Sequence, residues 1–329
     1  MGSGGRLPRR TDVVRILTVV TKPLVPLTGS QYEIEAGPYR ATVTGLGAGL
    51  RELRFDGEPL VDGYHPDELP PAAAGQLLAP WPNRIDGGRY TFDDESLQLA
   101  VSEPARATAI HGLTRWAPWT VCSHDASAVT LRCAPHGQQG YPFSVEIDAT
   151  YDVEATAGLR VTITTRNRGS RPAPYGNGAH PYLTGRTPSL DECELTLPAT
   201  QWLPLDDRGL PAGPPEPVQG TKYDFRRSRV IGETQLDSAL TGLLRSDEDG
   251  LAWARLADLG NGTRVSLWIG PGYRWLQVFT GDSLGPDRRR KAIAIEPMTC
   301  PPNAFATGHD LLVLQPGDEV AHTWGIKAN

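Results

Sequence analysis

Residues 143–167 read FSVEIDATYDVEATAGLRVTITTRN, and this stretch indicates the fold class. Apolar and polar side chains alternate along both of its halves, as they do in strands that are buried on one face only. Gly158 lies between the halves, where glycine permits the tight turn of a hairpin. The sequence therefore predicts two long antiparallel strands. The side chains expected to point into the core include Ile147, Leu159, Val161 and Ile163.

The same alternation recurs outside this hairpin in nine shorter segments. They are residues 39–46, 49–55, 88–94, 96–101, 128–134, 264–269, 274–280, 291–297 and 311–317. The chain contains 30 prolines and 36 glycines, and their frequent spacing is typical of strands joined by turns. The one candidate helix, residues 247–258, is interrupted by Gly250. We therefore predict an all-β protein, built as a large antiparallel β-sandwich.

The domain organisation is expected to be simple. Residues 1–28 are basic, contain prolines and lack a hydrophobic pattern, which predicts a loosely ordered N-terminal arm. Residues 204–220 are predicted to be a long, proline-rich surface loop. The strand pattern is alike on both sides of that loop, and no repeat of fixed period is visible. Residues 29–329 are therefore predicted to form a single domain.

The composition of the chain argues against several classes of binding partner. The chain has 39% hydrophobic residues and a formal net charge of −6, whereas a nucleic acid or an anionic membrane would require a basic face. No apolar run is long enough to cross a membrane, and no signal peptide is recognised. The cysteines contain no CxxC pair, so neither a zinc site nor a disulfide framework is indicated. We expect a soluble, cytoplasmic monomer or homodimer. The cysteines are Cys122, Cys133, Cys193 and Cys300.

Two glycine-rich motifs are interpreted as turns. GLGAG at residues 45–49 resembles a dinucleotide-binding loop, but a strand-like segment follows it where a helix would be required. GDSLG at residues 281–285 matches the nucleophile elbow of serine hydrolases, but Pro286 and three arginines follow it, again in place of a helix.

Two histidines lie in unusual contexts. His111 opens HGLTRWAPW, and His180 lies in YGNGAHPYL, where Gly176 and Gly178 allow the backbone to approach other groups closely. Each can be either a hydrogen-bonded structural residue or a catalytic one. The other five are interpreted as surface or turn residues. They are His65, His124, His136, His309 and His322.

Glu296 ends an apolar strand in KAIAIEPMTCPPNAF. Such a carboxylate usually reaches solvent or pairs with an arginine, but burial would raise its pKa towards that of a general base. Four further polar residues stand in marked segments and are able to bind hydroxyl groups. They are Asn83, Arg84, Asp237 and Gln277.

Taken in this order, the segments resemble the aldose 1-epimerase (galactose mutarotase) family over about residues 30–325. The family's N-R-I segment corresponds to Asn83-Arg84-Ile85, and its H-G segment to His111-Gly112 with Trp116 close behind. Its histidine signature corresponds to residues 177–182, NGAHPY. Asp237 corresponds to the substrate aspartate, Gln277 in QVFTG to the glutamine, and Glu296 to the catalytic glutamate.

The resemblance implies a many-stranded antiparallel supersandwich and an isomerase that interconverts the α and β anomers of a free hexose. It implies that Glu296 is the base and His180 the acid, with the two exchanging roles when the ring recloses. The implied ligand is a small monosaccharide, and no cofactor is needed. Trp116 is expected to supply an apolar face for the sugar. The implied substrate-binding residues are Asn83, Arg84, His111, Asp237 and Gln277.

The sequence departs from the family signature on both sides of the histidine. Gly178-Ala179 replace the commoner Thr-Asn, and residues 183–185, LTG, replace Phe-Asn-Leu. These departures are typical of a divergent bacterial branch, some members of which act on other sugars, including sulfonated ones. The alternatives are therefore a hexose 6-phosphate or sulfonated-hexose 1-epimerase, or a non-catalytic carbohydrate-binding protein. A phosphate would require extra basic residues at the pocket mouth, such as Arg89, Arg115 or Arg274.

Overall fold

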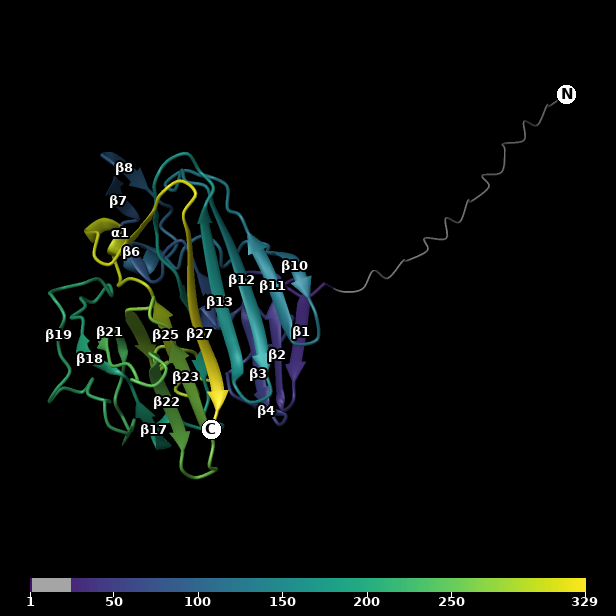
Figure 1. Ribbon diagram of the computed structural model, residues 1–329, viewed down its shortest axis with the longest axis vertical. Helices are drawn as coiled ribbons and strands as arrows, with labels where there is room; N and C mark the ends of the chain where they lie inside the picture. The colour runs from purple at the N-terminus through teal and green to yellow at the C-terminus, as the bar shows by residue number, and fades with distance from the viewer. Residues whose placement is uncertain (2–24) are drawn as a thin grey trace.

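Antiparallel strands are the main regular element of the computed structural model, which describes Met1 and residues 25–329 (Figure 1). The predicted N-terminal arm falls mainly on residues 2–24 and so lies outside the described residues. Every pairing between two named strands is antiparallel. None of the helices in the described residues has the length and apolar character needed to cross a membrane.

The predicted hairpin forms the middle of a nine-stranded sheet (Figure 1). Strand β12 (Val145–Glu154) pairs with β13 (Gly158–Asn167), and Gly158 turns the chain with a φ of +82°. All four side chains predicted to point inward are buried. The sheet order is β10 (Thr120–His124), β11 (Ala128–Cys133), β12, β13, β27 (Glu319–Ala328), β23 (Arg264–Ile269), β22 (Ala252–Asp258), β17 (Cys193–Thr196) and β20 (Arg229–Val230).

An eight-stranded sheet carries much of the candidate site. Its order is β19 (Glu216–Pro217), β18 (Ala199–Trp202), β21 (Asp237–Leu243), β24 (Trp275–Phe279), β25 (Ile293–Met298), β15 (Gly178–Ala179) and β5 (Leu77–Leu78), with β16 (Tyr182–Leu183) also paired to β25.

Smaller sheets complete the fold. One has four strands, β1 (Gln31–Ala36), β2 (Tyr39–Thr44), β3 (Leu50–Phe55) and β4 (Glu58–Pro59). Three are two-stranded and pair β6 (Arg84–Asp86) with β9 (Thr108–Ile110), β7 (Arg89–Phe92) with β8 (Glu95–Gln98), and β14 (Ala173–Tyr175) with β26 (Leu312–Leu314). The one α-helix in the described part is α1 (Ala304–Thr307), and the 3-10 turns are Pro71–Ala73, Pro104–Arg106 and Leu190–Glu192.

The core lies between the large sheets. One hydrophobic cluster contains Leu267 and Trp324 of the nine-stranded sheet together with Leu276 and Ile295 of the eight-stranded sheet. Strand β12 also packs against β1 and β2 of the four-stranded sheet. The predicted all-β sandwich is therefore confirmed.

The candidate helix at residues 247–258 does not form, because β22 (Ala252–Asp258) occupies most of that segment. Ala252, Ala254 and Leu256 are buried, whereas the residues between them are less so. This is a period of two, and pairing with β17 and β23 on either side satisfies the backbone of β22 as a strand.

Two predicted loops and one histidine can be compared with the structure. Residues 45–49 form the turn between β2 and β3, as expected. Residues 204–220 are mainly loop but include β19, and Leu210 and Val218 within them are buried. His322 is not a surface residue: it lies on β27 opposite Ile163, on the same inward face as Trp324, and is buried.

Candidate active site

A row of side chains crosses one face of the eight-stranded sheet. The register of β24 and β25 sets Gln277 directly opposite Glu296. On the other side of β25, Gly178 pairs with the position two residues after that glutamate and Tyr182 with the position two residues before it, which brings His180 opposite Glu296 as well. Because neighbours across an antiparallel ladder share a face, the three polar side chains point the same way.

Asp237 joins this face at the start of β21. It pairs with Phe279, two residues beyond Gln277 on β24, and strand alternation gives both positions the same face. Nε2 of Gln277 donates a 2.7 Å hydrogen bond to Oδ1 of Asp237. The glutamine therefore holds the carboxylate at the edge of the row.

A second wall comes from the short sheet of β6 and β9. Asn83 and His111 flank a pair of this sheet, and both have a positive φ, of 55° and 62°. The backbone N–H of Asn83 donates to Nδ1 of His111 at 3.2 Å, so the neutral ring carries its proton on Nε2. Gly112 follows with a φ of +71°, and a Cβ atom there would lie 2.0 Å from the carbonyl oxygen of Ala79. Glycine is therefore required beside this histidine.

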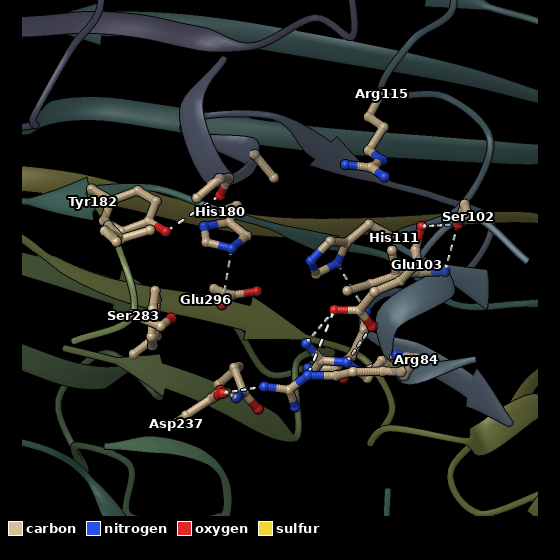
Figure 2. A pocket seen from close by; sticks show the side chains of 18 residues that line it. Arg84, Ser102, Glu103, His111, Arg115, His180, Tyr182, Asp237, Ser283 and Glu296 are labelled. Atoms are coloured by element: carbon tan, nitrogen blue, oxygen red, sulfur yellow. Dashed lines mark hydrogen bonds and ion pairs between the residues drawn. The ribbon is translucent and has the colours of Figure 1, made fainter. Parts of the chain in front are cut away.

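The two walls enclose a cavity of about 340 Å³ (Figure 2). This lies within the usual range for a small-molecule site. All seven site residues predicted from the sequence line it. They are Asn83, Arg84, His111, His180, Asp237, Gln277 and Glu296.

His180 and Glu296 form a close, buried pair. Nε2 of the histidine lies 3.3 Å from Oε1 of the glutamate, and the two residues are 6% and 2% exposed (Figure 2). Burial lowers the pKa of His180 to about 3, and the positive charges of Arg115 and Arg84 act in the same direction. Burial raises the pKa of Glu296 well above its ordinary value, helped by the charge of Asp237. Around neutral pH the pair therefore holds one proton between two groups that both resist charging.

Arg84 is held in a fixed orientation by Glu103, which is not among the residues expected from the sequence. Its Nε and Nη2 donate to Oε2 and Oε1 of Glu103 at 2.7 and 3.0 Å (Figure 2). Thr108 Oγ1 donates to the same Oε2 at 2.7 Å. Such a two-pronged contact fixes the plane of the guanidinium. No periodic pattern marks Glu103, because it lies in a loop before a 3-10 turn and meets Arg84 only in the folded chain.

Tyr182, the last residue of the histidine signature, also lines the cavity. Its ring stacks on the imidazole of His180, with centroids 5.0 Å apart and planes 23° apart. Its place in the sequence could have indicated this contact. Residues two apart in a strand share a face, and Tyr182 follows His180 by two residues. The tyrosine covers one side of the imidazole and restricts its rotation.

The expected role of Trp116 is wrong. Its side chain is 48% exposed and does not line the cavity, because the chain turns it outward, within 5.3 Å of the Arg115 guanidinium carbon. Tyr182, Phe279 and Leu284 supply the apolar wall instead.

Ser283 of the GDSLG motif also lines the cavity. It makes no hydrogen bond to a histidine anywhere in residues 25–329, so the arrangement of a serine nucleophile with its base is missing from this part of the chain. Within the same residues, no group of three or more histidine, cysteine or acidic side chains is arranged to hold a metal ion. All four cysteines are free thiols.

Comparison with known proteins agrees with this geometry. A sequence model of the aldose 1-epimerase family matches residues 30–327. The uncharacterized protein YihR of Escherichia coli (strain K12) is 35% identical over 306 residues, covering 92% of this chain and 96% of YihR. Galactose mutarotase of Homo sapiens is 26% identical over 274 residues, covering 77% of this chain and 78% of the human protein.

Solved structures share the fold. The GalM/aldose epimerase homologue of C. elegans superposes with a TM-score of 0.80 at 22% identity, covering 91% of this chain and 99% of the homologue. A putative aldose 1-epimerase of Escherichia coli K12 gives a TM-score of 0.78 at 20% identity, with coverage of 91% and 99%. The family match spans almost every described residue from Ser30 onward. The chain therefore belongs to the aldose 1-epimerase family, whose members are isomerases that act on carbohydrates.

Proposed function

We propose that this protein interconverts the α and β anomers of a free hexose by acid–base opening and reclosure of the sugar ring. The observation that carries the proposal is the buried pair of His180 and Glu296, with an N–O distance of 3.3 Å in one wall of the cavity. Anomer exchange requires one group to take the proton of the C1 hydroxyl and another to protonate the ring oxygen. Both groups are available within one small site.

The reaction takes one proton from the sugar and returns one to it, and the pair of His180 and Glu296 is able to do both. Ring opening uses the form of the pair in which the shared proton lies on His180. The Glu296 carboxylate takes the proton from the C1 hydroxyl, a C1=O double bond forms, the bond from C1 to the ring oxygen breaks, and the His180 imidazolium protonates that oxygen. The open-chain sugar then faces a neutral acid and a neutral imidazole, which are the forms that burial favours. Rotation about the C1–C2 bond and reversal of the transfers closes the ring on its other face.

The remaining cavity residues bind and orient the sugar in this proposal. The Nε2 proton of His111 is available to a sugar oxygen, since Nδ1 is already occupied by the backbone. Arg84, held by Glu103, presents its guanidinium to the sugar. Sugar hydroxyls bind to three further side chains: they donate to the carboxylate of Asp237, and they donate to or accept from the amides of Gln277 and Asn83. Such a polar site discriminates against sugars that leave its groups unpaired.

The test is anomer exchange measured by NMR on galactose and glucose, corrected for the spontaneous rate. Glu296→Gln and His180→Ala should each remove the acceleration, because each deletes one of the two proton-transfer groups. His124→Ala is the matched control, since this histidine lies on the exposed strand β10. Folding of each variant is checked by circular dichroism. Wild-type rates in folded Glu296→Gln, on a sugar that the wild type accepts, would contradict the mechanism.

The competing function is carbohydrate binding without catalysis. It would retain Arg84 and Asp237 but not require the acid–base pair. A sugar that raises the thermal midpoint of the wild type, with no anomer exchange above the spontaneous rate, would favour this alternative.

A hexose bearing an anionic group, such as a phosphate or a sulfonate at C6, is a second candidate substrate. The observation that favours it is Arg115, which lines the cavity but makes no ion pair or side-chain hydrogen bond within residues 25–329 (Figure 2). Arg84, by contrast, is paired with Glu103. Of the other arginines considered from the sequence, Arg89 bonds to Gln98 and Arg274 to Asp310, and neither lines the cavity.

Comparing glucose with glucose 6-phosphate and a 6-sulfonated hexose tests this candidate. If Arg115 binds the anion, Arg115→Gln should lower kcat/KM for the anionic sugar by about tenfold or more relative to glucose, as expected for a charged hydrogen bond. Arg89→Gln is the control outside the cavity. Equal losses for glucose and for the anionic sugars in Arg115→Gln would contradict an anion-binding role.

The proposal includes a cytoplasmic location and a monomeric or homodimeric state. Free thiols at all four cysteines support a reducing compartment. Cell fractionation and light scattering test these two points.

A further inference from the structure

A second cavity, of about 240 Å³, adjoins the first. Arg106 and Asp237 line both, so these two side chains stand between the cavities. Nη2 of Arg106 lies 3.8 Å from Oδ2 of Asp237, a separation too long for a hydrogen bond. The two cavities therefore share a boundary at Arg106 and Asp237.

An aromatic pair lines the second cavity. The rings of Trp202 and Tyr223 are stacked, with centroids 4.3 Å apart and planes 23° apart. Trp202 lies on β18 and is half-buried, and its indole Nε1 is buried without a hydrogen-bond partner in the described residues. Aromatic surface beside polar groups suits a pyranose ring, whose C–H face packs on an aromatic ring while its hydroxyls reach the neighbours.

Acidic groups supply those neighbours. Asp206 and Asp207 line the second cavity together with Asp237. Oδ1 of Asp206 accepts hydrogen bonds from the backbone N–H groups of Arg208 and Leu210, both at 2.9 Å. The Asp207 carboxylate accepts no hydrogen bond from the described residues. Carboxylates accept hydrogen bonds from sugar hydroxyls.

The loop that forms this wall is fixed to the main cavity. Arg208 pairs with Asp86 at 2.5 Å and donates from Nε to the carbonyl oxygen of Arg106 at 2.9 Å. Gly209 packs directly on the arginines of the main cavity: a Cβ atom there would lie 2.8 Å from Nη1 of Arg84 and 2.9 Å from Nη1 of Arg106. The second cavity therefore has a preformed wall, which reduces the entropic cost of binding.

We propose that the second cavity is a subsite for a further pyranose unit, so that the protein binds a reducing disaccharide across Arg106 and Asp237. The reducing unit lies in the main cavity with its C1 at His180 and Glu296, and the second unit packs on Trp202 and Tyr223. This inference rests on the proposed function for the first unit only.

The test compares the free hexose that the wild type accepts with disaccharides in which that hexose is the reducing unit, linked through each of its hydroxyls in turn. NMR gives kcat/KM for anomer exchange on each sugar. At least one linkage should give a kcat/KM equal to or above that of the free hexose. Trp202→Ala should lower the ratio of these two values by about fivefold, as expected for loss of one aromatic contact. Because both sugars are measured on one preparation, misfolded protein cancels from the ratio.

Trp253→Ala is the matched control, since Trp253 lies on β22 and lines neither cavity. It should leave the ratio at its wild-type value. The inference is overturned if every disaccharide is slower than the free hexose in the wild type, or if Trp202→Ala and Trp253→Ala change the ratio equally.

The same experiment separates this inference from the proposed function. If the wild type accelerates exchange of no free hexose, the proposed function fails, and the subsite is then tested by saturation-transfer NMR with methyl glycosides of the same disaccharides. Weaker saturation of the non-reducing unit in Trp202→Ala than in wild type supports the subsite. Equal saturation overturns it.

Discussion

At the scale of single residues, the chemistry depends on how far burial shifts the pKa values of two groups. His180 and Glu296 carry shifts of opposite sign, and both shifts favour the uncharged form. Their proton therefore belongs to the pair rather than to either residue. This has a direct consequence for the pH dependence of the reaction.

We predict a broad pH plateau for kcat/KM of anomer exchange. Activity requires one proton on the pair, so it should fall only below the lowered pKa of His180, about 3, or above the raised pKa of Glu296. NMR rates between about pH 4 and about pH 9, corrected for spontaneous exchange, test this. A steep loss centred near the ordinary histidine pKa of about 6.5 would show instead that His180 titrates as a solvated side chain.

Glu103 should affect sugar binding by holding Arg84 in position. Glu103→Gln leaves one acceptor oxygen in place of two, so one hydrogen bond from Arg84 is lost, the other is no longer assisted by charge, and the guanidinium is freed to move. We expect KM to rise by about tenfold with a smaller change in kcat. Glu95→Gln is the matched control, because Glu95 makes a similar fork with Arg171 on the surface. Equal KM values for the two variants would contradict a positioning role for Glu103.

At the scale of elements, the site depends on strand register and on close backbone approaches. Strand β25 lies between β24 and β15, and this pairing alone brings Gln277, Glu296 and His180 into one row. A shift of one residue in β25 would turn Glu296 to the other face of the sheet. The His111 wall depends similarly on the contact of Gly112 with Ala79.

Gly112→Ala should be more destabilising than an alanine at an ordinary positive-φ glycine. The new Cβ would lie 2.0 Å from a backbone oxygen, whereas at Gly57, where φ is +80°, no atom lies within 4 Å of it. Gly57→Ala therefore reports the backbone cost alone, about 1 kcal/mol. Gly112→Ala should cost roughly 1–3 kcal/mol more and raise KM, since His111 must move. Urea unfolding and NMR rates measure both effects, and equal unfolding free energies would contradict the argument.

At the scale of the whole molecule, buried histidines link stability to pH. Burial lowers the pKa of His322 to about 4, that of His180 to about 3, and that of His111 well below its ordinary value. The unfolded chain binds these protons near pH 6.5, whereas the folded chain does not. Stability from these residues is therefore present above about pH 6.5 and is lost as the pH falls towards the folded-state pKa values.

His322→Gln should flatten that dependence. It removes one residue whose pKa falls from 6.5 to about 4, a linkage worth roughly 3 kcal/mol between those pH values. The thermal midpoint, measured from about pH 7 down to about pH 4, should therefore fall less in the variant than in the wild type. His309→Gln, at an exposed position, is the control. An unchanged slope in His322→Gln would exclude this residue as a source of the acid sensitivity.

Much of the architecture follows from local pattern. The alternation in residues 143–167 is a property of neighbouring residues, so it specified the hairpin of β12 and β13 and its buried face. Local pattern did not identify the strand within residues 247–258, where β22 forms because β17 and β23 pair with it. Periodicity alone cannot tell a short buried strand from a helix.

The sequence by itself determined the strand-rich fold class, the family resemblance and the identity of seven residues that line the cavity. Only the tertiary structure decided that His180 and Glu296 meet in a buried wall of the cavity, that Glu103 holds Arg84, and that Trp116 faces outward. The physical reason is that alternation sets which face a side chain takes, whereas pairing of strands distant in sequence sets what that side chain meets and how much water remains around it.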